Sequence, residues 1–280
     1  MINEKNKQFT LALVVLIFLF INLNLARVAP IVPILGFHGI IGSEPFPSSA
    51  EFDYPQEDLE KVLEYLIVNN YWFLTAQDLH DFFLTKFYKI PREHLKQKPI
   101  MISFDDGYKT VNTNLLPILS KLEKQYGKKV KVVLFINPGT LATSESSDST
   151  HLGCQELREG LKRSFYDIQS HGQNHKKLTR LPAHNLVEEL LQAQTELRKC
   201  TEDLDPKQKV ASHLAYPYGA YNQQVVKYAS KYYQSSYIYN NQILNHGCLK
   251  NYYQIPRLTV NRQQSAQQLI EMVSAKSDMC

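Results

Sequence analysis

Short apolar runs alternate with stretches of helical periodicity along the chain from residue 31 onward. The alternation begins with the run IVPILGF at 31–37 and the helix-like stretch EDLEKVLEYLIVNN at 57–70. The strand-like runs that follow are YWFL (71–74), PIMISF (99–104), VKVVLFI (130–136), FYDIQS (165–170), VASHLAY (210–216), SSYIY (235–239) and YQIPRLTV (253–260). The other helix-like stretches lie at 75–83, where Thr75 and Asp78 form a capping box, at 110–125, 184–200 and 222–233, and from about 264. Strands that alternate with helices predict a parallel sheet, and seven or eight such units predict an α/β fold, a distorted (β/α) barrel.

The chain has the length and composition of one large globular domain. Its 280 residues are 44% hydrophobic and 21% charged, and no internal repeat or linker separates a second domain. We therefore expect one domain over residues 30–280, with the serine-rich stretch at 142–150 as an exposed loop. The formal net charge of +4 is too small to indicate a nucleic-acid partner.

Residues 1–29 have the pattern of an export segment. Lys5 and Lys7 precede an unbroken apolar stretch from Leu11 to Ile21. This stretch is shorter than the roughly 20 residues of a membrane-spanning helix, which favours a signal peptide, but no clean cleavage site follows it. A signal peptide and an uncleaved membrane anchor both stay open, with a buried terminal helix as the third alternative. Either of the first two predicts a secreted or membrane-anchored domain outside the cytoplasm.

The cysteines show no metal-binding pattern. They are widely spaced and include no Cys-x-x-Cys pair, which argues against a zinc knuckle or a thioredoxin-like motif. The four are Cys154, Cys200, Cys248 and Cys280. One or two disulfides formed after export and buried free thiols are both consistent with this spacing.

Residue types that carry chemistry follow several apolar runs directly. His38 follows the first run, Asp105 and Asp106 follow PIMISF, His171 follows FYDIQS, and YPYG occupies 216–219. Because chemistry in barrels of this kind gathers at the carboxyl ends of the strands, we expect these residues to lie together.

A pair of histidines suggests a metal site. His171 and His175, in SHGQNH, are four residues apart, which predicts a helical turn with both imidazoles on one face, able to hold one metal ion. Taken singly, a histidine is more often a surface or hydrogen-bonded residue, and Asp-Asp-Gly is more often a solvated turn. The remaining histidines are expected to be structural or at the surface: His80, His94, His151, His184, His213 and His246.

With these residues in this order, the chain resembles the polysaccharide deacetylases of carbohydrate esterase family 4, the NodB-like domain. SFDDG is similar to the first motif of that family, SHGQNH to its second and YPYG to most of its third, and the resemblance covers about residues 31–262. It implies a hydrolase that removes N-acetyl groups from a polysaccharide. It also implies a divalent metal on Asp106, His171 and His175, with Asp105 as the general base.

The residue types agree with this division of roles. Adjacent residues that leave a strand point to opposite sides, so Asp106 can face the metal while Asp105 faces the attacking water. One Asp and two His leave coordination positions open, and a mixed nitrogen and oxygen set favours zinc, with cobalt, nickel or iron tolerated. By the resemblance, the backbone amide of Tyr218 donates to the oxyanion, whereas YPYG could otherwise be a plain turn.

Two departures from the family pattern concern the general acid and an arginine. The family often carries its acidic histidine in a Leu-x-His motif near the C-terminus, where this chain has no match. A subgroup similar to the poly-N-acetylglucosamine deacetylases carries the motif at the start of the domain, and ILGFHGI fits that arrangement, which implies His38 as the acid rather than a structural histidine. Where the family often has an arginine two positions before the third-motif proline, this chain has Ala215. Arg257, in IPRLTV, could supply that guanidinium to Asp105 from another strand, or could form a surface ion pair.

The permuted layout favours poly-β-1,6-N-acetylglucosamine of a biofilm matrix as the substrate polysaccharide. Peptidoglycan, chitin and acetylated xylan remain alternatives within the same enzyme class. A catalytically weak carbohydrate-binding or export accessory domain is the alternative from another class. Trp72, Tyr108, Tyr218 and Tyr221 are candidates for stacking on sugar rings.

Overall fold

The structure is a computed structural model that describes residues 31–42, 52–86, 88–143 and 150–275. All of them belong to one compact unit, Ile31–Cys280. The expected export segment at 1–29 and the last cysteine, Cys280, lie outside the described residues. Within the described ranges, no helix combines the length and the apolar character needed to cross a membrane.

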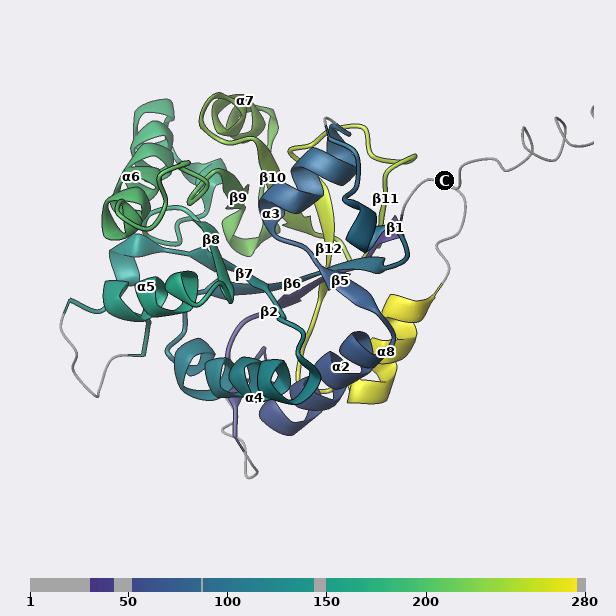
Figure 1. Cartoon of the computed structure of the whole chain (residues 1–280). Helices are drawn as coiled ribbons and strands as arrows, with labels where there is room; N and C mark the ends of the chain where they lie inside the picture. The colour runs from purple at the N-terminus through teal and green to yellow at the C-terminus, as the bar shows by residue number, and fades with distance from the viewer. Residues whose placement is uncertain (1–30, 43–51, 87, 144–149, 276–280) are drawn as a thin grey trace, which may run out of the picture. The chain divides into compact units, whose positions relative to one another are not determined.

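Eight parallel strands form the main sheet of the described chain. They are β2 (Ile34–Phe37), β5 (Tyr71–Phe73), β6 (Lys98–Asp106), β7 (Val132–Ile136), β8 (Tyr166–Ser170), β9 (His213–Ala215), β10 (Ser235–Tyr239) and β12 (Ile255–Thr259). Hydrogen bonds join them in the order β2-β12-β10-β9-β8-β7-β6-β5, and a further pairing of β2 with β6 closes all but β5 into a barrel (Figure 1). The predicted distorted (β/α) barrel is confirmed, with β5 attached outside the ring to the start of β6.

Helices connect most successive strands and cover the outside of the barrel. The longer ones are α2 (Gln56–Val68), α4 (Leu116–Tyr126), α5 (Cys154–Lys162), α6 (Ala183–Thr201), α7 (Gln223–Tyr232) and α8 (Ala266–Ser274). Two short pairs add to the strands: β1 (Ile31–Val32) with β11 (Leu244–Asn245), and β3 (Ile40–Ile41) with β4 (Tyr54–Pro55). The connection between β10 and β12 carries β11 in place of a helix, which makes the barrel irregular on that side.

The strands are apolar throughout because both of their faces are buried. In β7, Val133 and Phe135 belong to the cluster that fills the barrel, whereas Val132, Leu134 and Ile136 belong to the cluster under the helices. Strands covered on both faces read as unbroken apolar runs rather than as alternating ones. This is why VKVVLFI and PIMISF were recognisable as strands of a parallel sheet.

The expected elements are present, with two local differences. The first apolar run is divided at Pro33 into β1 and β2, because proline has no N–H to donate to a neighbouring strand. The capping box is confirmed: the Thr75 side chain accepts from the Asp78 N–H and the Asp78 carboxylate from the Thr75 N–H. The helix that it starts is short, α3 (Ala76–Asp78), and continues as the π-helical segment η1 (Leu79–Leu84).

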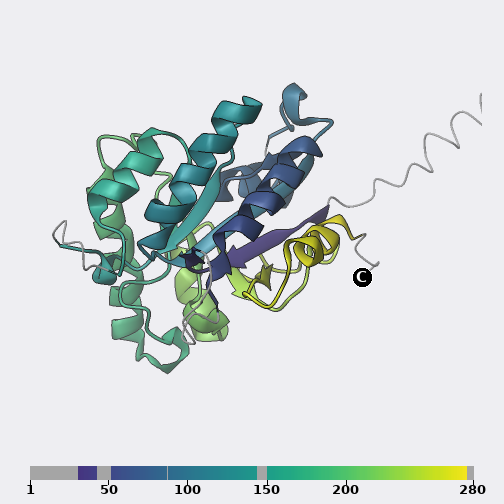
Figure 2. The ribbon, with the colours of Figure 1, turned by 90° about the horizontal axis from the view of Figure 1, so that it is seen from below.

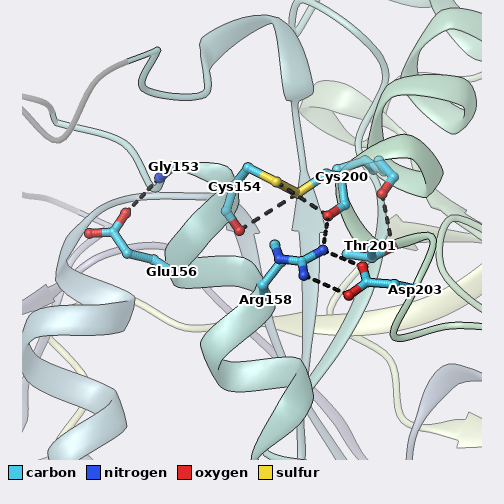
Figure 3. The surroundings of a disulfide bond; sticks show 8 residues. Gly153, Cys154, Glu156, Arg158, Cys200, Thr201 and Asp203 are labelled. Atoms are coloured by element: carbon cyan, nitrogen blue, oxygen red, sulfur yellow. Dashed lines mark hydrogen bonds and ion pairs between the residues drawn. A yellow bond between two sulfur atoms is a disulfide. The ribbon is translucent and has the colours of Figure 1, made fainter.

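A disulfide ties α5 to α6 (Figure 3). It joins Cys154, the first residue of α5, to Cys200 near the end of α6. Beside it, Arg158 donates two hydrogen bonds to the Asp203 carboxylate, at 2.6 and 2.8 Å. Cys248 is disulfide-bonded as well. Of the two alternatives that the cysteine spacing left open, the structure contains disulfides.

The first and last strands of the barrel are neighbours. Leu35 of β2 lies opposite Leu258 of β12, and Figure 2 shows the purple N-terminal strand beside the yellow C-terminal segment. The carboxyl ends of all the barrel strands therefore meet at one end of a closed ring, which brings together side chains from distant parts of the sequence.

Candidate active site

Three of the predicted residues converge at the carboxyl ends of β6 and β8. Asp106 ends β6, and His171 and His175 follow β8. The Asp106 Oδ1 atom lies 3.5 Å from His171 Nε2 and 3.3 Å from His175 Nε2. One candidate ligand atom from each of the three residues lies within 4.8 Å of the other two. This grouping matches the set that the sequence predicted.

The donor atoms of this trio are suited to a divalent metal ion. Asp106 Oδ1 is buried and has no hydrogen-bond partner among the described residues. The His171 Nδ1 atom pairs with the backbone oxygen of Ala215 at 2.8 Å, which directs Nε2 toward Asp106. A ligating histidine commonly has its second nitrogen fixed in this way, and two imidazoles with one carboxylate form a set that zinc accepts.

Burial favours the uncharged form of His171. It lowers the pKa of this histidine to about 3, with Asp105 acting in the opposite direction. Burial and the neighbouring charge of Asp105 together raise the pKa of Asp106 to about 6. A neutral imidazole is the form that binds a metal, and a bound cation favours the ionised form of a carboxylate.

The second aspartate, Asp105, forms a buried ion pair with an arginine. Its carboxylate is fully buried and accepts hydrogen bonds from Arg257 Nη1 at 2.6 Å and from Arg257 Nη2 at 2.8 Å. Burial by itself would raise the pKa of Asp105, but the charge and hydrogen bonds of Arg257, together with the neighbouring His171 and His38, outweigh it and hold this pKa well below its usual range. Of the two alternatives for Arg257, the structure has the contact with Asp105 and not a surface ion pair.

Arg257 is itself held from several sides. It is fully buried in β12, and its Nη1 atom also donates to Ser103 Oγ at 3.2 Å. Its guanidinium carbon lies 4.0 Å from the centroid of the Tyr239 ring and 5.0 Å from that of Phe135. Ala215, at the family's usual arginine position, lines the barrel interior instead.

Three site residues have left-handed backbone conformations. The φ angles of Asp106, His175 and Tyr218 are 70°, 53° and 61°. Residues other than glycine seldom adopt this region, and such conformations cluster at functional sites. The prediction of a helical turn over the two histidines was wrong. The chain leaves β8 in an extended loop through Gly172, whose φ is 76°, and the two rings come within 5.1 Å without a helix.

A cavity of about 550 Å³ opens over these groups. Besides both aspartates and the two histidines, it is lined by His38, Phe52, Asp53, Tyr108, Tyr218, Tyr239 and Thr259. His38 follows β2, and its ring centroid lies 5.3 Å from that of Phe52 and 6.0 Å from that of Tyr239. Tyr218 is largely exposed and lies 4.5 Å from the His175 ring, centroid to centroid. Every predicted site residue except Arg257 therefore lines this cavity, and Arg257 lies behind Asp105.

The aromatic candidates separate into two groups. Tyr108 and Tyr218 line the cavity, whereas Trp72 is buried in β5 against Phe82, Phe83 and His94, away from it. Tyr221 lines a different and smaller cavity. Trp72 was therefore a wrong candidate for stacking on a substrate.

Sequence reasoning missed four residues of the cavity, Phe52, Asp53, Tyr239 and Thr259. Thr259 ends β12. Tyr239 ends the strand SSYIY, so its place after an apolar run was a signal of the same kind that identified His38. Phe52 and Asp53 follow no apolar run, and nothing in their spacing indicates the site.

Comparisons with known proteins agree with the motifs. A family model for polysaccharide deacetylases matches residues 92–235. The chain is 26% identical over 199 residues to the Bacillus subtilis protein YxkH, whose name describes it as a polysaccharide deacetylase. That match covers 71% of this chain and 61% of YxkH, so the chain spans less than two thirds of the length of this relative.

Solved structures share the fold. A polysaccharide deacetylase from Bacillus cereus superposes with a TM-score of 0.72 at 22% identity, over 88% of this chain and 70% of that one. A de-N-acetylase from Aggregatibacter actinomycetemcomitans superposes with a TM-score of 0.62 at 18% identity, over 86% and 99%. At these identities the likeness concerns the barrel and not the substrate.

Proposed function

Because the chain belongs to the polysaccharide deacetylase family, we propose that it is a metal-dependent hydrolase that removes N-acetyl groups from an extracellular polysaccharide, poly-β-1,6-N-acetylglucosamine first among them. The observation that carries the proposal is the buried Asp105 beside the trio Asp106, His171 and His175, at the base of one cavity. A binding module would have no use for a second, arginine-held carboxylate next to the ligand trio.

Asp106, His171 and His175 would hold the metal ion. Zinc is the first choice for this donor set, with cobalt, nickel or iron tolerated. When bound, the ion would supply Lewis-acid activation of a water molecule and of the acetyl carbonyl.

Asp105 is the proposed general base. An ionised carboxylate has about four acceptor sites, and Arg257 occupies two of those on Asp105. The carboxylate also lines the cavity, so a proton from a water there is within its reach. The low pKa of Asp105 keeps its carboxylate ionised, which is the form that a general base must have.

His38 and Tyr218 would complete the reaction. The water oxygen bonds to the acetyl carbon while Asp105 takes its proton, and the carbonyl oxygen becomes an oxyanion, for which the Tyr218 N–H is the proposed donor. The C–N bond then breaks, His38 gives a proton to the departing sugar amine, and acetate is released. His38 and the ligand trio line the same cavity, which supports this role.

The choice of an N-acetylated polymer draws on two supports. The A. actinomycetemcomitans neighbour is described as a de-N-acetylase. In addition, the early position of His38 fits the permuted layout of the poly-N-acetylglucosamine deacetylases. An extracytoplasmic location, with or without membrane attachment through residues 1–29, is also part of the proposal. The Cys154–Cys200 disulfide supports it because disulfides persist in oxidising compartments.

Acetate release tests the proposal. The chain from residue 30 is incubated with poly-β-1,6-N-acetylglucosamine, with and without a chelator, beside Asp105→Asn. Chitin, peptidoglycan and acetylated xylan serve as parallel substrates. We expect release that stops with the chelator, returns with added zinc, and is lost in the variant. Release from another polymer alone would correct the substrate, and no release from any of them would favour the carbohydrate-binding alternative.

Direct metal binding is measured separately by titration calorimetry. His171→Ala should abolish zinc binding. His184→Ala is the matched control because its side chain is 83% exposed and does not belong to the trio, and it should bind zinc as the unaltered chain does.

A further inference from the structure

Tyr239 contacts the proposed base from a third strand. It is the last residue of β10, and its hydroxyl donates to Asp105 Oδ2 at 2.9 Å. The same oxygen accepts from Arg257 Nη2 at 2.8 Å. The carboxylate therefore has three donors, two from β12 and one from β10.

The Tyr239 ring also packs against the guanidinium of Arg257. The guanidinium carbon of Arg257 lies 4.0 Å from the ring centroid, within the range of a cation–π contact. The ring also lines the cavity. One tyrosine thus contacts the proposed base and its arginine, and it reaches the space where a substrate would bind.

The barrel leaves room for this phenol through a glycine. A Cβ atom at Gly36 of β2 would lie 2.5 Å from the Tyr239 hydroxyl oxygen and 2.5 Å from its Cε1 atom. A contact this short would displace the ring, so any side chain at position 36 would move the hydroxyl away from Asp105.

The hydroxyl keeps its proton in this setting. Burial raises the pKa of Tyr239 well above its ordinary value, and the neighbouring Asp105 charge raises it further, although Arg257 acts in the opposite direction. Tyr239 is therefore a donor to the carboxylate and not a competing anion.

We propose that Tyr239 is a positioning residue for Asp105, which together with Arg257 leaves the carboxylate with about one open acceptor site and so fixes the direction from which it takes a proton. This inference rests on the proposed deacetylase function. Without the hydroxyl, a second acceptor site opens on Oδ2 and the carboxylate gains freedom to turn. A misdirected base slows the proton transfer without weakening the binding of the sugar.

The test is Tyr239→Phe, which keeps the ring over Arg257 and removes only the hydroxyl. Tyr237→Phe is the matched control. Tyr237 lies on the same strand, points into the same barrel and is fully buried, but it makes no hydrogen bond to Asp105. Kinetics of acetate release are measured for both variants, together with zinc affinity and the thermal midpoint.

For Tyr239→Phe we expect a fall in kcat of about tenfold or more with KM and zinc affinity unchanged, whereas Tyr237→Phe should retain the unaltered kcat. Gly36→Ala should lower kcat in the same way, because its methyl group displaces the hydroxyl while the phenol itself remains. An unchanged kcat in Tyr239→Phe would overturn the inference. A rise in the KM of Tyr239→Phe of about the same size, with kcat unchanged, would overturn it too, since Tyr239 would then be a substrate contact.

Failure of the proposed function would look different. The unaltered chain would then release no acetate from any of the polymers, whereas failure of the positioning role requires an active chain whose Tyr239→Phe variant is equally fast.

Discussion

Two arginine–aspartate pairs of this protein have the same geometry in opposite surroundings. Arg257 and Asp105 are fully buried inside the barrel, whereas Arg158 and Asp203 lie at the surface beside the disulfide. Both arginines donate to both oxygens of their partner. Removing one member of a buried pair leaves a desolvated charge, while water replaces the lost partner of an exposed one.

Arg257→Ala should therefore weaken both turnover and the fold. We expect a sharp loss of kcat, and a free energy of unfolding lower by about 3–5 kcal/mol, because Asp105 stays buried without its counter-charge. Metal content should not change, since Arg257 contacts none of the three proposed ligands. Urea unfolding of the metal-free chain measures the stability loss, with Arg158→Ala as the exposed counterpart that should lose less. Equal losses in the two variants would contradict the assignment.

Asp167 of β8 is buried like Asp105, but its pKa is shifted in the opposite direction. No arginine of the described ranges pairs with it, and its carboxylate accepts from the Ala76 N–H at the start of α3 and from Gln169 Nε2. Burial raises the pKa of Asp167 from 3.8 to about 6, against these hydrogen bonds. Between these two pH values the unfolded chain has already released the proton that the folded chain still holds.

Stability should consequently fall as the pH rises through that window. Relative to Asp167→Asn, which does not titrate, the unaltered chain should lose up to about 3 kcal/mol between pH 3.8 and about 6 and no more above it. The amide also changes the hydrogen bonding, but by an amount that does not depend on pH. Urea titrations of both chains with chelator present, across this range, give the difference. A difference that grows in favour of the unaltered chain as pH rises would show that the hydrogen bonds outweigh burial.

Single residues were predictable where they follow an apolar run. His38 and His171 stand directly after β2 and β8, and Asp105 and Asp106 end β6. A closed parallel barrel brings such positions together. Arg257 was predictable because this chain has Ala215 where the family often has an arginine, so that another arginine had to be sought as the partner of Asp105. Asp53 and Phe52 were not, since the fold of their loop, and not a strand, places them at the cavity.

At the scale of elements, the disulfide shows what spacing alone does not determine. Four cysteines allow several pairings, and only the packing of α5 beside α6 brings Cys154 and Cys200 together. The turn after β8 shows a similar limit. A separation of four residues predicted a helix, but left-handed conformations at Gly172 and His175 bring the two rings together along another path.

Removing that disulfide should cost stability and leave catalysis intact. The double change Cys154→Ala and Cys200→Ala opens a loop of 46 residues, which corresponds to about 4 kcal/mol of chain entropy in the unfolded state. Neither cysteine lines the cavity over the ligand trio, so kcat at 25 °C should match that of the unaltered chain. Urea unfolding and acetate release test the two statements. A large loss of kcat would mean that α5 and α6 hold the metal ligands in place.

At the scale of the molecule, the order of the strands follows the chain around the ring. From β2 through β6, β7, β8, β9 and β10 to β12, each strand pairs with the next one in sequence. A regular alternation of strands and helices predicts this winding, which is why the fold could be inferred from the sequence. The attachment of β5 outside the ring could not, because its apolar run YWFL is like those of the barrel strands.

The closing contact of the ring joins its first strand to its last, and this has a consequence for timing. A chain synthesised from its N-terminus has β2 long before β12, so Leu35 can pair with Leu258 only near the end of synthesis. β6 and β8, whose carboxyl ends position the ligand trio, can both pair with β7 before that moment. Arg257 and Tyr239 arrive only with the final strands, and until then Asp105 has neither of its partners. On the proposed function, we expect the chain to gain the ability to bind metal earlier than the ability to hydrolyse, because Asp105 acquires its partners only with β10 and β12.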